Sequence, residues 1–281
     1  MLGMKKEEYR ETFSAEPGTV LKVYNKTGSV DVSSWDRDYV EVEAIKKSIS
    51  DKLVPLNEAR IEVTPGNEFV VRTHYDTFRS RGVSVDYRIT VPKGVLVTHL
   101  ETATGKINVA DVSGDVDAKA STGAIQIHKV NGFIKAVTST GSINVDNVSG
   151  DVDAKASTGA IKIQRVDGFV RAVASTGSID ITGVGGIYEA RTSTGKISAE
   201  VQAIRDSLEI RSSMGGITVF LSPSIAAQLE VNTSNGSITY EDLPLTVSQS
   251  SKTRLIGRLG EGGGKIDIKT STGSIHLKKL P

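Results

Sequence analysis

The chain has 281 residues, of which 38% are hydrophobic and 24% charged, and its formal net charge is +1. This composition is typical of a folded protein with a sizeable core. A charge so close to neutral argues against nucleic-acid binding, which usually needs a basic face. The absence of cysteine excludes a disulfide framework and thiolate metal sites, and leaves the redox compartment open.

The N-terminal residues 1–8 are polar and contain no apolar segment of the kind that a signal peptide requires. No apolar run elsewhere approaches the length of a membrane span, so we expect no transmembrane segment. Two locations stay open. These are the cytoplasm, if Met1 is the native start, and an exported location, if a leader has been removed.

Residues 20–91 are rich in strand-forming residues but follow no regular repeat. One short helix or loop is expected near residues 48–60. The terminal units of a repeat protein are atypical because they must close an exposed edge. We therefore interpret residues 1–100 as an N-terminal cap together with the first, irregular coils.

Residues 101–200 contain a strict internal repeat. Glycine recurs at an unbroken spacing of nine, at Gly105, Gly114, Gly123, Gly132, Gly141, Gly150, Gly159, Gly168, Gly177, Gly186 and Gly195. Two kinds of nonapeptide alternate, which makes the true period eighteen residues. Apolar and polar residues alternate between the glycines, which is the period of a strand. X-Gly pairs supply the positive φ angles of tight corners.

Each eighteen-residue repeat is therefore predicted to be one coil of two short strands and two glycine corners, stacked on its neighbours at about 4.8 Å per coil. Stacking places equivalent residues in columns. The predicted inward column is Ala118, Ala136, Ala154, Ala172 and Ala190, opposite a column of Ile. The predicted outward column, which alternates in charge and so sets the register, is Asp117, Lys135, Asp153, Arg171 and Glu189.

Residues 201–281 keep the same signature at looser spacing, as in Thr272-Gly273-Ser274-Ile275, and are interpreted as less regular C-terminal coils and a cap. The glycine run 262–264 is expected to be a flexible connection before the last pair of strands. The predicted fold class is all-β, a single-stranded β-solenoid (β-helix) that forms one continuous elongated domain.

Several segments together resemble a known family. They are the opening Pro17-Gly18-Thr19-Val20, the step Thr90-Val91-Pro92-Lys93-Gly94, the Thr-Gly-x-Ile repeats and the closing Ser271-Thr272-Gly273-Ser274-Ile275. Over nearly the whole chain these residues resemble the bacterial DUF4097 family of candidate adhesins. The resemblance implies a β-helix and a location in the cell envelope or at the surface. It rests on turn and core residues, and it brings no catalytic residues with it.

Alternate coils carry apolar residues at positions that strict alternation directs outward, namely Phe133, Val137, Phe169 and Val173. One interpretation is that the N-terminal segment folds over them. The other is a surface for a protein partner or for self-association, because exposed apolar patches usually mark contacts. We favour this strip over any other part of the chain as a binding site. Tyr188 falls in an inward column and is expected in the core.

The Ser-Thr-Gly corners form a ladder of hydroxyls at Thr122, Thr140, Thr158, Thr176 and Thr194. Such a ladder can hold a glycan or order water. Ser and Thr at corners commonly satisfy backbone groups, and we favour that structural interpretation.

The spacing of nine is also similar to that of calcium-binding RTX repeats. The aspartate pairs Asp115/Asp117 and Asp151/Asp153 occur only on alternate coils, and we expect them on strands and not in turns. Calcium requires six to eight converging oxygens, so we predict no metal site.

The residues offer little for catalysis. The four histidines, His74, His99, His128 and His276, show neither metal-binding spacing nor an evident carboxylate partner, and known catalytic motifs are absent. We predict a protein without cofactor or enzymatic activity, an adhesin-like rigid scaffold for protein–protein contact or self-association. Two alternatives stay open: a carbohydrate-binding or carbohydrate-processing β-helix protein, and an intracellular assembly scaffold.

Overall fold

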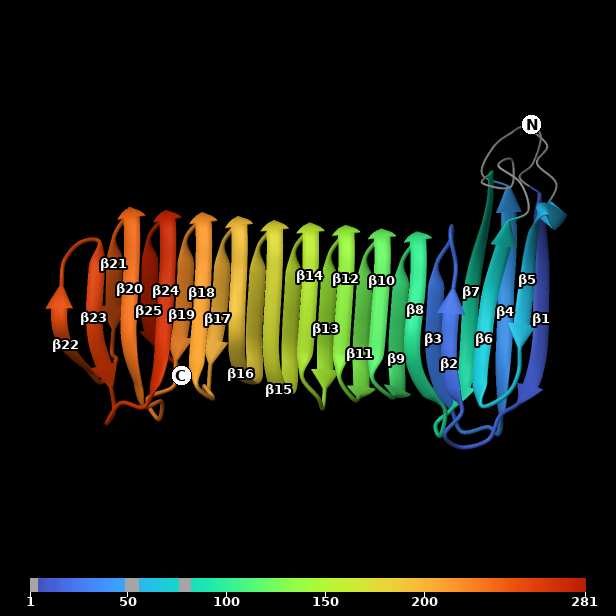
Figure 1. Ribbon diagram of the computed structural model, residues 1–281, viewed down its shortest axis with the longest axis horizontal. Helices are drawn as coiled ribbons and strands as arrows, with labels where there is room; N and C mark the ends of the chain where they lie inside the picture. Colours follow the sequence, from blue (N-terminus) through green and yellow to red (C-terminus); the bar gives the residue numbers. More distant parts are fainter. Residues whose placement is uncertain (1–4, 49–55, 76–81) are drawn as a thin grey trace. The chain divides into compact units, whose positions relative to one another are not determined.

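The computed structural model describes residues 5–48, 56–75 and 82–281 and divides into two compact units, residues 1–140 and 141–281. The predicted β-solenoid class is confirmed, because the described residues form strands throughout, joined by turns that include the 3-10 turn η1 (Leu56–Glu58) (Figure 1). That turn falls within the predicted helix or loop near residues 48–60, of which residues 49–55 lie outside the described part of the chain.

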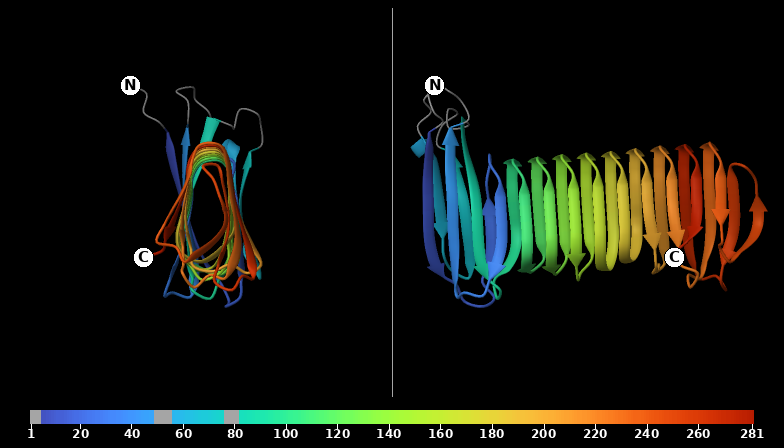
Figure 2. Two further views of the ribbon diagram at one scale, coloured as in Figure 1. Left: turned by 90° about the vertical axis from the view of Figure 1, so that its left-hand side faces the viewer. Right: turned by 180° about the vertical axis from the view of Figure 1, so that it is seen from behind.

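The first unit has two walls of paired strands. In spatial order, one wall comprises β5 (Ala59–Thr64), β6 (Glu68–Tyr75), β2 (Val20–Tyr24), β8 (Leu96–Thr104), β10 (Val116–Thr122) and β12 (Ile134–Thr140). The other comprises β1 (Lys6–Ser14), β4 (Tyr39–Ser48), β7 (Val83–Pro92), β3 (Val30–Trp35), β9 (Ile107–Ser113) and β11 (Ile125–Asn131). The walls lie face to face (Figure 2). Buried apolar side chains fill the space between them.

The cap of the first unit is inserted within a pair of neighbouring coils. β2 and β3, the first coil, pair in parallel with β8 and β9, although residues 36–95 lie between β3 and β8 in the sequence. The chain between them forms the outer strands, where β4 pairs antiparallel with both β7 and β1, and β5 with β6. The outermost strand β1 carries Lys6, Glu7, Glu8, Arg10 and Glu11, and charges of this kind protect a sheet edge from further pairing.

The second unit repeats the two-walled plan. One wall comprises β14 (Val152–Thr158), the ends of β15 (Ile161–Thr176) and β16 (Ile179–Thr194), then β18 (Ser207–Met214), β24 (Gly264–Thr272), β20 (Ala227–Asn235), β23 (Arg254–Leu259) and β22 (Leu245–Ser250). The other comprises β13 (Ile143–Val148), the starts of β15 and β16, then β17 (Ile197–Val201), β19 (Ile217–Leu221), β25 (Ile275–Lys279) and β21 (Ile238–Glu241).

The last coil of the second unit is also out of chain order. β24 lies between β18 and β20, and β25 lies between β19 and β21 (Figure 1). The intervening strands β20 to β23 therefore form the outer end of this unit, and the C-terminal strands are enclosed by parallel partners on both sides.

The interior columns follow the predicted periodicity within each unit. Ala118 lies opposite Ala136 in the first unit, and Ala154, Ala172 and Ala190 are aligned in the second; all five are fully buried. The Ile column faces them, with Ile161 opposite Ile179. Burial of this apolar area is the main term that stabilises the stack.

Glycine is required at the Thr-Gly corners for two reasons. Gly177 has φ of +148°, and a Cβ there would lie 2.0 Å from the carbonyl oxygen of Gly159 on the preceding coil. The Gly177 N–H donates to the Thr194 carbonyl on the following coil at 2.8 Å. The corner is therefore a backbone-to-backbone contact that leaves no room for a side chain.

The alternation of buried and exposed residues is interrupted at a bend between the glycine corners, which the sequence did not indicate. Ile125 and Ile127 are buried and His128 is exposed, as strand alternation requires, but Lys129 is exposed as well and Val130 turns inward. Lys129 has φ of 54°, and Asp111 has φ of 57° at the equivalent position, so each adopts the left-handed conformation that resets the phase.

Candidate binding surfaces

The first-unit half of the apolar strip is open to solvent. Phe133 is 40% exposed and Val137 is half-buried, whereas Ile134 and Ala136 beside them are fully buried. This exposure argues against the interpretation that the N-terminal segment covers Phe133. The Phe133 N–H donates to the Asp115 carboxylate on the preceding coil at 2.8 Å, which fixes the backbone from which the ring projects.

The second-unit half of the strip is partly covered. Phe169 and Val173 are half-buried. The Phe169 ring lies 5.0 Å from that of Tyr188 between centroids, and the Arg205 guanidinium lies over it at 4.2 Å. Phe169 is thus covered by a stacked aromatic ring and a cation, while Phe133 is not, and the two phenylalanines belong to different units.

The prediction that Tyr188 lies in the core is wrong, since its side chain is 36% exposed. The register shifts at this point, with Val170 opposite Ile187 and Arg171 opposite Glu189. Two residues therefore oppose one, as in a β-bulge, and Ile187 takes the inward position while Tyr188 projects outward.

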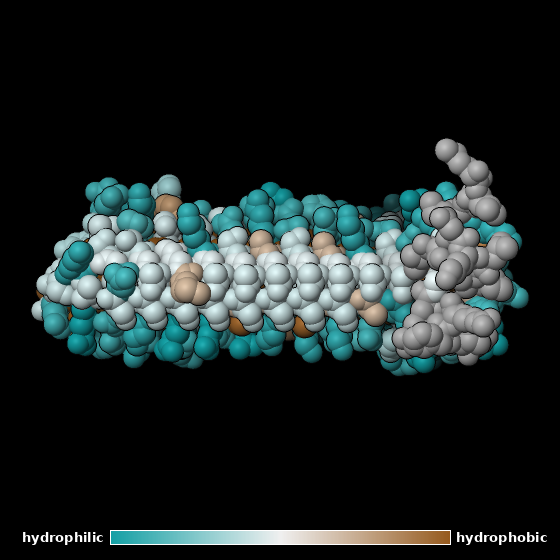
Figure 3. Space-filling model, turned by 90° about the horizontal axis from the view of Figure 1, so that it is seen from above, coloured by the Kyte–Doolittle hydropathy of each residue, from teal (hydrophilic) through white to brown (hydrophobic). Residues whose placement is uncertain are grey.

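The hydroxyl ladder is exposed at all five threonines. Thr122 lies opposite Thr140 in the first unit, and Thr158, Thr176 and Thr194 are aligned in the second. Figure 3 shows the corners as a pale, smooth surface bordered by hydrophilic side chains. In the second unit the row of threonines is interrupted by Met214, which lies opposite Thr194 and is 57% exposed, and it resumes at the exposed Thr272 opposite Met214.

The corner chemistry that we assigned to the ladder is performed by other residues. Thr138 and Thr192, two positions before the ladder, are buried, and their hydroxyls donate to the Gly123 and Gly177 carbonyls at 3.0 Å. Within the described chain no hydrogen bond is formed by the five ladder hydroxyls themselves. The signal for the buried donors is the Thr-Ser-Thr-Gly variant of the corner, at residues 138–141 and 192–195.

The predicted position of Asp115 and Asp151 on strands is wrong. β10 and β14 begin one residue later, and the two carboxylates lie at corners, where they accept the N–H of Phe133 and of Phe169 at 2.8 and 2.7 Å. They therefore serve as backbone acceptors. In the described ranges no group of three or more His, Asp or Glu converges in a way that would hold a metal ion.

The outward charged column forms the predicted ion pairs within each unit. Lys135 lies 3.7 Å from Asp117, and Arg171 lies 3.8 Å from Asp153 and 2.7 Å from Glu189. Because these side chains are substantially exposed, each pair contributes at most about 1 kcal/mol. Their value in fixing the register stays a prediction.

His74 and His99 have carboxylate partners, which we did not expect. His74 contacts Glu62 across the β5–β6 pair, and His99 lies 3.4 Å from Glu101 on its own strand. His276 instead bonds to the Thr239 hydroxyl at 2.7 Å. These are separate pairs on wall surfaces and do not meet in one site.

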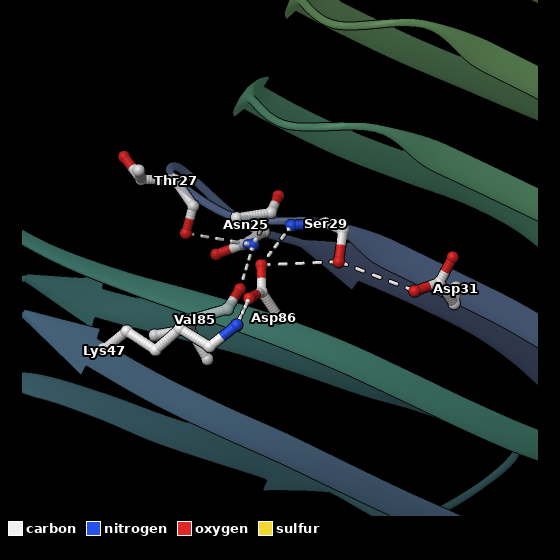
Figure 4. A network of polar contacts seen from close by, with 8 residues as sticks. Asn25, Thr27, Ser29, Asp31, Lys47, Val85 and Asp86 are labelled. Atoms are coloured by element: carbon white, nitrogen blue, oxygen red, sulfur yellow. Dashed lines mark hydrogen bonds and ion pairs between the residues drawn. The ribbon is translucent and has the colours of Figure 1, made fainter. Parts of the chain in front are cut away.

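A polar network joins the first coil to the cap (Figure 4). The buried Asn25 amide donates to the Val85 carbonyl at 2.8 Å and accepts from the Thr73 hydroxyl at 3.0 Å. Asp86 accepts from the Ser29 N–H at 2.8 Å and pairs with Lys47 at 2.7 Å. Partial burial favours a raised pKa for Asp86, but the bonds from Lys47 and Ser29 outweigh it and lower the pKa.

Among the described residues, the structure shows no helix with the length and apolar character needed to cross a membrane.

Comparison with known proteins places the chain in a family. No curated protein matches it. A protein from Clostridium sporogenes, provisionally described as a cell adhesion protein, is 12% identical, with 98% of this chain and 100% of that chain aligned and a TM-score of 0.28. A provisionally described adhesin from Bacteroides fragilis is 11% identical, with 98% and 97% aligned and a TM-score of 0.44. The family described as Toastrack DUF4097 matches residues 19–278, and the chain therefore belongs to that family.

Proposed function

We propose that the chain is a non-enzymatic, adhesin-like binding scaffold whose exposed solenoid walls associate with protein, in the first instance with a second copy of the chain. The observation that carries the proposal is Phe133, a large apolar side chain that is left 40% exposed at the corner before β12. Several ionisable side chains of these walls, among them Lys135 and Arg171, are engaged in ion pairs between coils, which favours a scaffold over a catalytic groove.

Self-association suits the position of Phe133 for two reasons. Its backbone is held by Asp115, so the ring is presented by a fixed coil and little conformational entropy is lost when it becomes buried. The net charge of +1 imposes little repulsion between copies. Burying a phenylalanine side chain contributes roughly 1.5–3 kcal/mol, enough to decide whether a weak dimer forms.

The test is sedimentation-velocity ultracentrifugation of the wild type and of Phe133→Asp over a range of concentrations. We expect the wild type to associate and Phe133→Asp to shift the dissociation constant upward by roughly tenfold or more. Gln126→Asp, a change at an exposed position on the other wall of the same unit, is the control and should associate like the wild type. A wild type that stays monomeric, or a Phe133→Asp variant that associates normally, would contradict the proposal.

Glycan binding is a second candidate, favoured by the free hydroxyls of the ladder. Because Thr138 and Thr192 bond to the corner carbonyls, the side chains of Thr140 and Thr194 remain available to a ligand. A glycan array probed with the wild type and with the Thr176→Val/Thr194→Val double variant tests it. Binding that survives the double substitution would rule out the second-unit ladder.

A further inference from the structure

One outward column in the second unit changes its composition along the stack. In the regular coils it alternates between lysine and valine, with Lys119 opposite Val137 in the first unit and Lys155 opposite Val173 in the second. The residue that follows Val173 in this column is Arg191. From there the column is basic on three adjacent strands, since Arg191 lies opposite Arg211 and Arg211 lies opposite Lys269.

The third cation is present only because the last coil is inserted out of chain order. β24 enters between β18 and β20 and so places Lys269 beside Arg211, with the neutral Asn232 on its other side. Like charges on neighbouring strands repel each other, so a run of three departs from the alternation that the regular coils maintain. Local departures of this kind are expected at functional sites.

Neighbouring acidic residues neutralise only part of the positive charge of this row. Arg211 pairs with Glu209 at 2.8 Å, and Lys269 pairs with Asp267 at 2.9 Å. Arg191 is exposed and, in the part of the chain that the structure describes, has no ion-pair partner. An anion that approaches along the row therefore meets one unpaired cation and two cations that are shared with carboxylates.

A row of hydroxyls lies next to the basic row. The exposed residues Ser213, Ser271 and Ser234 lie two positions beyond Arg211, Lys269 and Asn232 on β18, β24 and β20. They line a groove of about 330 Å³ together with Arg191, Arg211 and Lys269. Cations thus form one side of the groove and free hydroxyls the other, and both rows repeat at the strand spacing of about 4.8 Å.

We propose that this groove binds an acidic oligosaccharide, with sugar carboxylates on the Arg191–Arg211–Lys269 row and sugar hydroxyls on the serine row. Guanidinium and ammonium groups form the strongest hydrogen bonds to carboxylates. The strand spacing is comparable to the length of one sugar unit, so successive units meet successive strands. No aromatic side chain lines the groove, which disfavours a nucleic-acid ligand that would stack its bases.

Titration calorimetry of the full chain with oligogalacturonate tests the proposal. We expect binding that weakens as salt is raised, and a malto-oligosaccharide of equal length should not bind, because it carries no carboxylate. Arg191→Gln and Lys269→Gln should each weaken binding roughly tenfold. Lys155→Gln is the matched control, since Lys155 occupies the same column of the same unit opposite a valine, and it should bind like the wild type.

The Ser213→Ala/Ser271→Ala double variant separates a saccharide site from a plain anion site. The proposal expects weaker binding without a change in thermal stability. An unaltered affinity would overturn the saccharide assignment. The whole site would be overturned by no binding to oligogalacturonate at low salt, by equal binding of the neutral oligosaccharide, or by equal losses in Lys155→Gln and Arg191→Gln. The groove shares no residue with the Phe133 surface, so either proposal can fail without the other.

Discussion

The regular coils and the caps are held together by different means. In the coils, the backbone at the Thr-Gly corners contacts the backbone of the next coil, and the side chains repeat in columns of Ala and Ile. In the N-terminal cap, antiparallel strands are joined to the first coil by individual side chains such as Asn25, Asp86 and Lys47. The coil interaction is therefore repeated many times, whereas each cap interaction occurs once.

The two caps share a construction even though their sequences differ. In each unit the terminal coil pairs with a regular coil, and the strands of the cap come from the chain segment between them, residues 36–95 in the first unit and 222–263 in the second. The first cap also contains β1. Their edges are protected differently. β1 is charged along its length, while the uncharged strand β22 has a register irregularity between Val247 and Gln249 where it pairs with β23. A bulge of this kind also discourages further pairing.

The sharpest way to break a coil is to add one methyl group at a corner. Gly177→Ala places a Cβ 2.0 Å from the Gly159 carbonyl oxygen at φ of +148°, so the backbone must move. We expect a loss of at least about 3 kcal/mol in the free energy of unfolding, measured by urea titration followed by circular dichroism.

Gly183→Asn is the control for that substitution. Gly183 has φ of +59°, a Cβ added there would lie 3.7 Å from its nearest neighbouring atom, and Asn147 takes the same conformation at the equivalent place. Its cost should stay below about 1 kcal/mol. Equal losses in the two variants would show that the close approach between coils is not what requires glycine at the corner.

A smaller effect should separate the two threonines of one corner. Thr192→Val removes a buried donor and leaves the Gly177 carbonyl without its 3.0 Å partner, which should cost about 1–2 kcal/mol. Thr194→Val alters an exposed side chain and should change the free energy of unfolding by less than about 0.5 kcal/mol. The same urea titration compares them. A larger loss of unfolding free energy in Thr194→Val than in Thr192→Val would indicate that the threonine ladder is structural.

Sequence periodicity was sufficient for the interior columns and the glycine corners, but not for the left-handed bend at Lys129, although that bend recurs at residues 111 and 147. The Ala column, the glycine corners and the ion pairs around Arg171 were predictable because the same contact recurs every eighteen residues. A structural feature that occurs once produces no periodic pattern in the sequence. The bulge that exposes Tyr188 and the insertion of β24 between β18 and β20 therefore escaped prediction, and the basic row around Lys269 escaped with them.

The same difference between repeated and single features applies to the candidate binding surfaces. The outward position of Phe133 could be predicted from strand alternation, but the cover over Phe169 depends on Arg205, which lies outside the regular repeat. The partners of the corner carbonyls were also assigned to the wrong threonines, because both Thr192 and Thr194 lie in the same short motif and only burial distinguishes them.

The weakest expected effect lies in the cap and depends on pH. Because the folded state lowers the pKa of Asp86, its bonds to Lys47 and Ser29 stabilise the cap fully at pH values above the ordinary aspartate pKa. This stabilisation is lost as the pH falls through the lowered, folded-state pKa. The amide proton shift of Ser29, followed by NMR through acid titration, should report that pKa directly, since this N–H donates to Asp86.

Asp86→Asn should abolish that titration and remove about 1 kcal/mol of stability at neutral pH, because the amide retains an acceptor for Ser29 but loses the ion pair with Lys47. Lys47→Met is the complementary variant, and it should raise the midpoint of the Ser29 titration toward or above the ordinary aspartate value. A wild-type midpoint at or above that value would show that burial outweighs the two hydrogen bonds. The cap would then gain stability on acidification, opposite to the behaviour expected from the Asp86–Lys47 geometry.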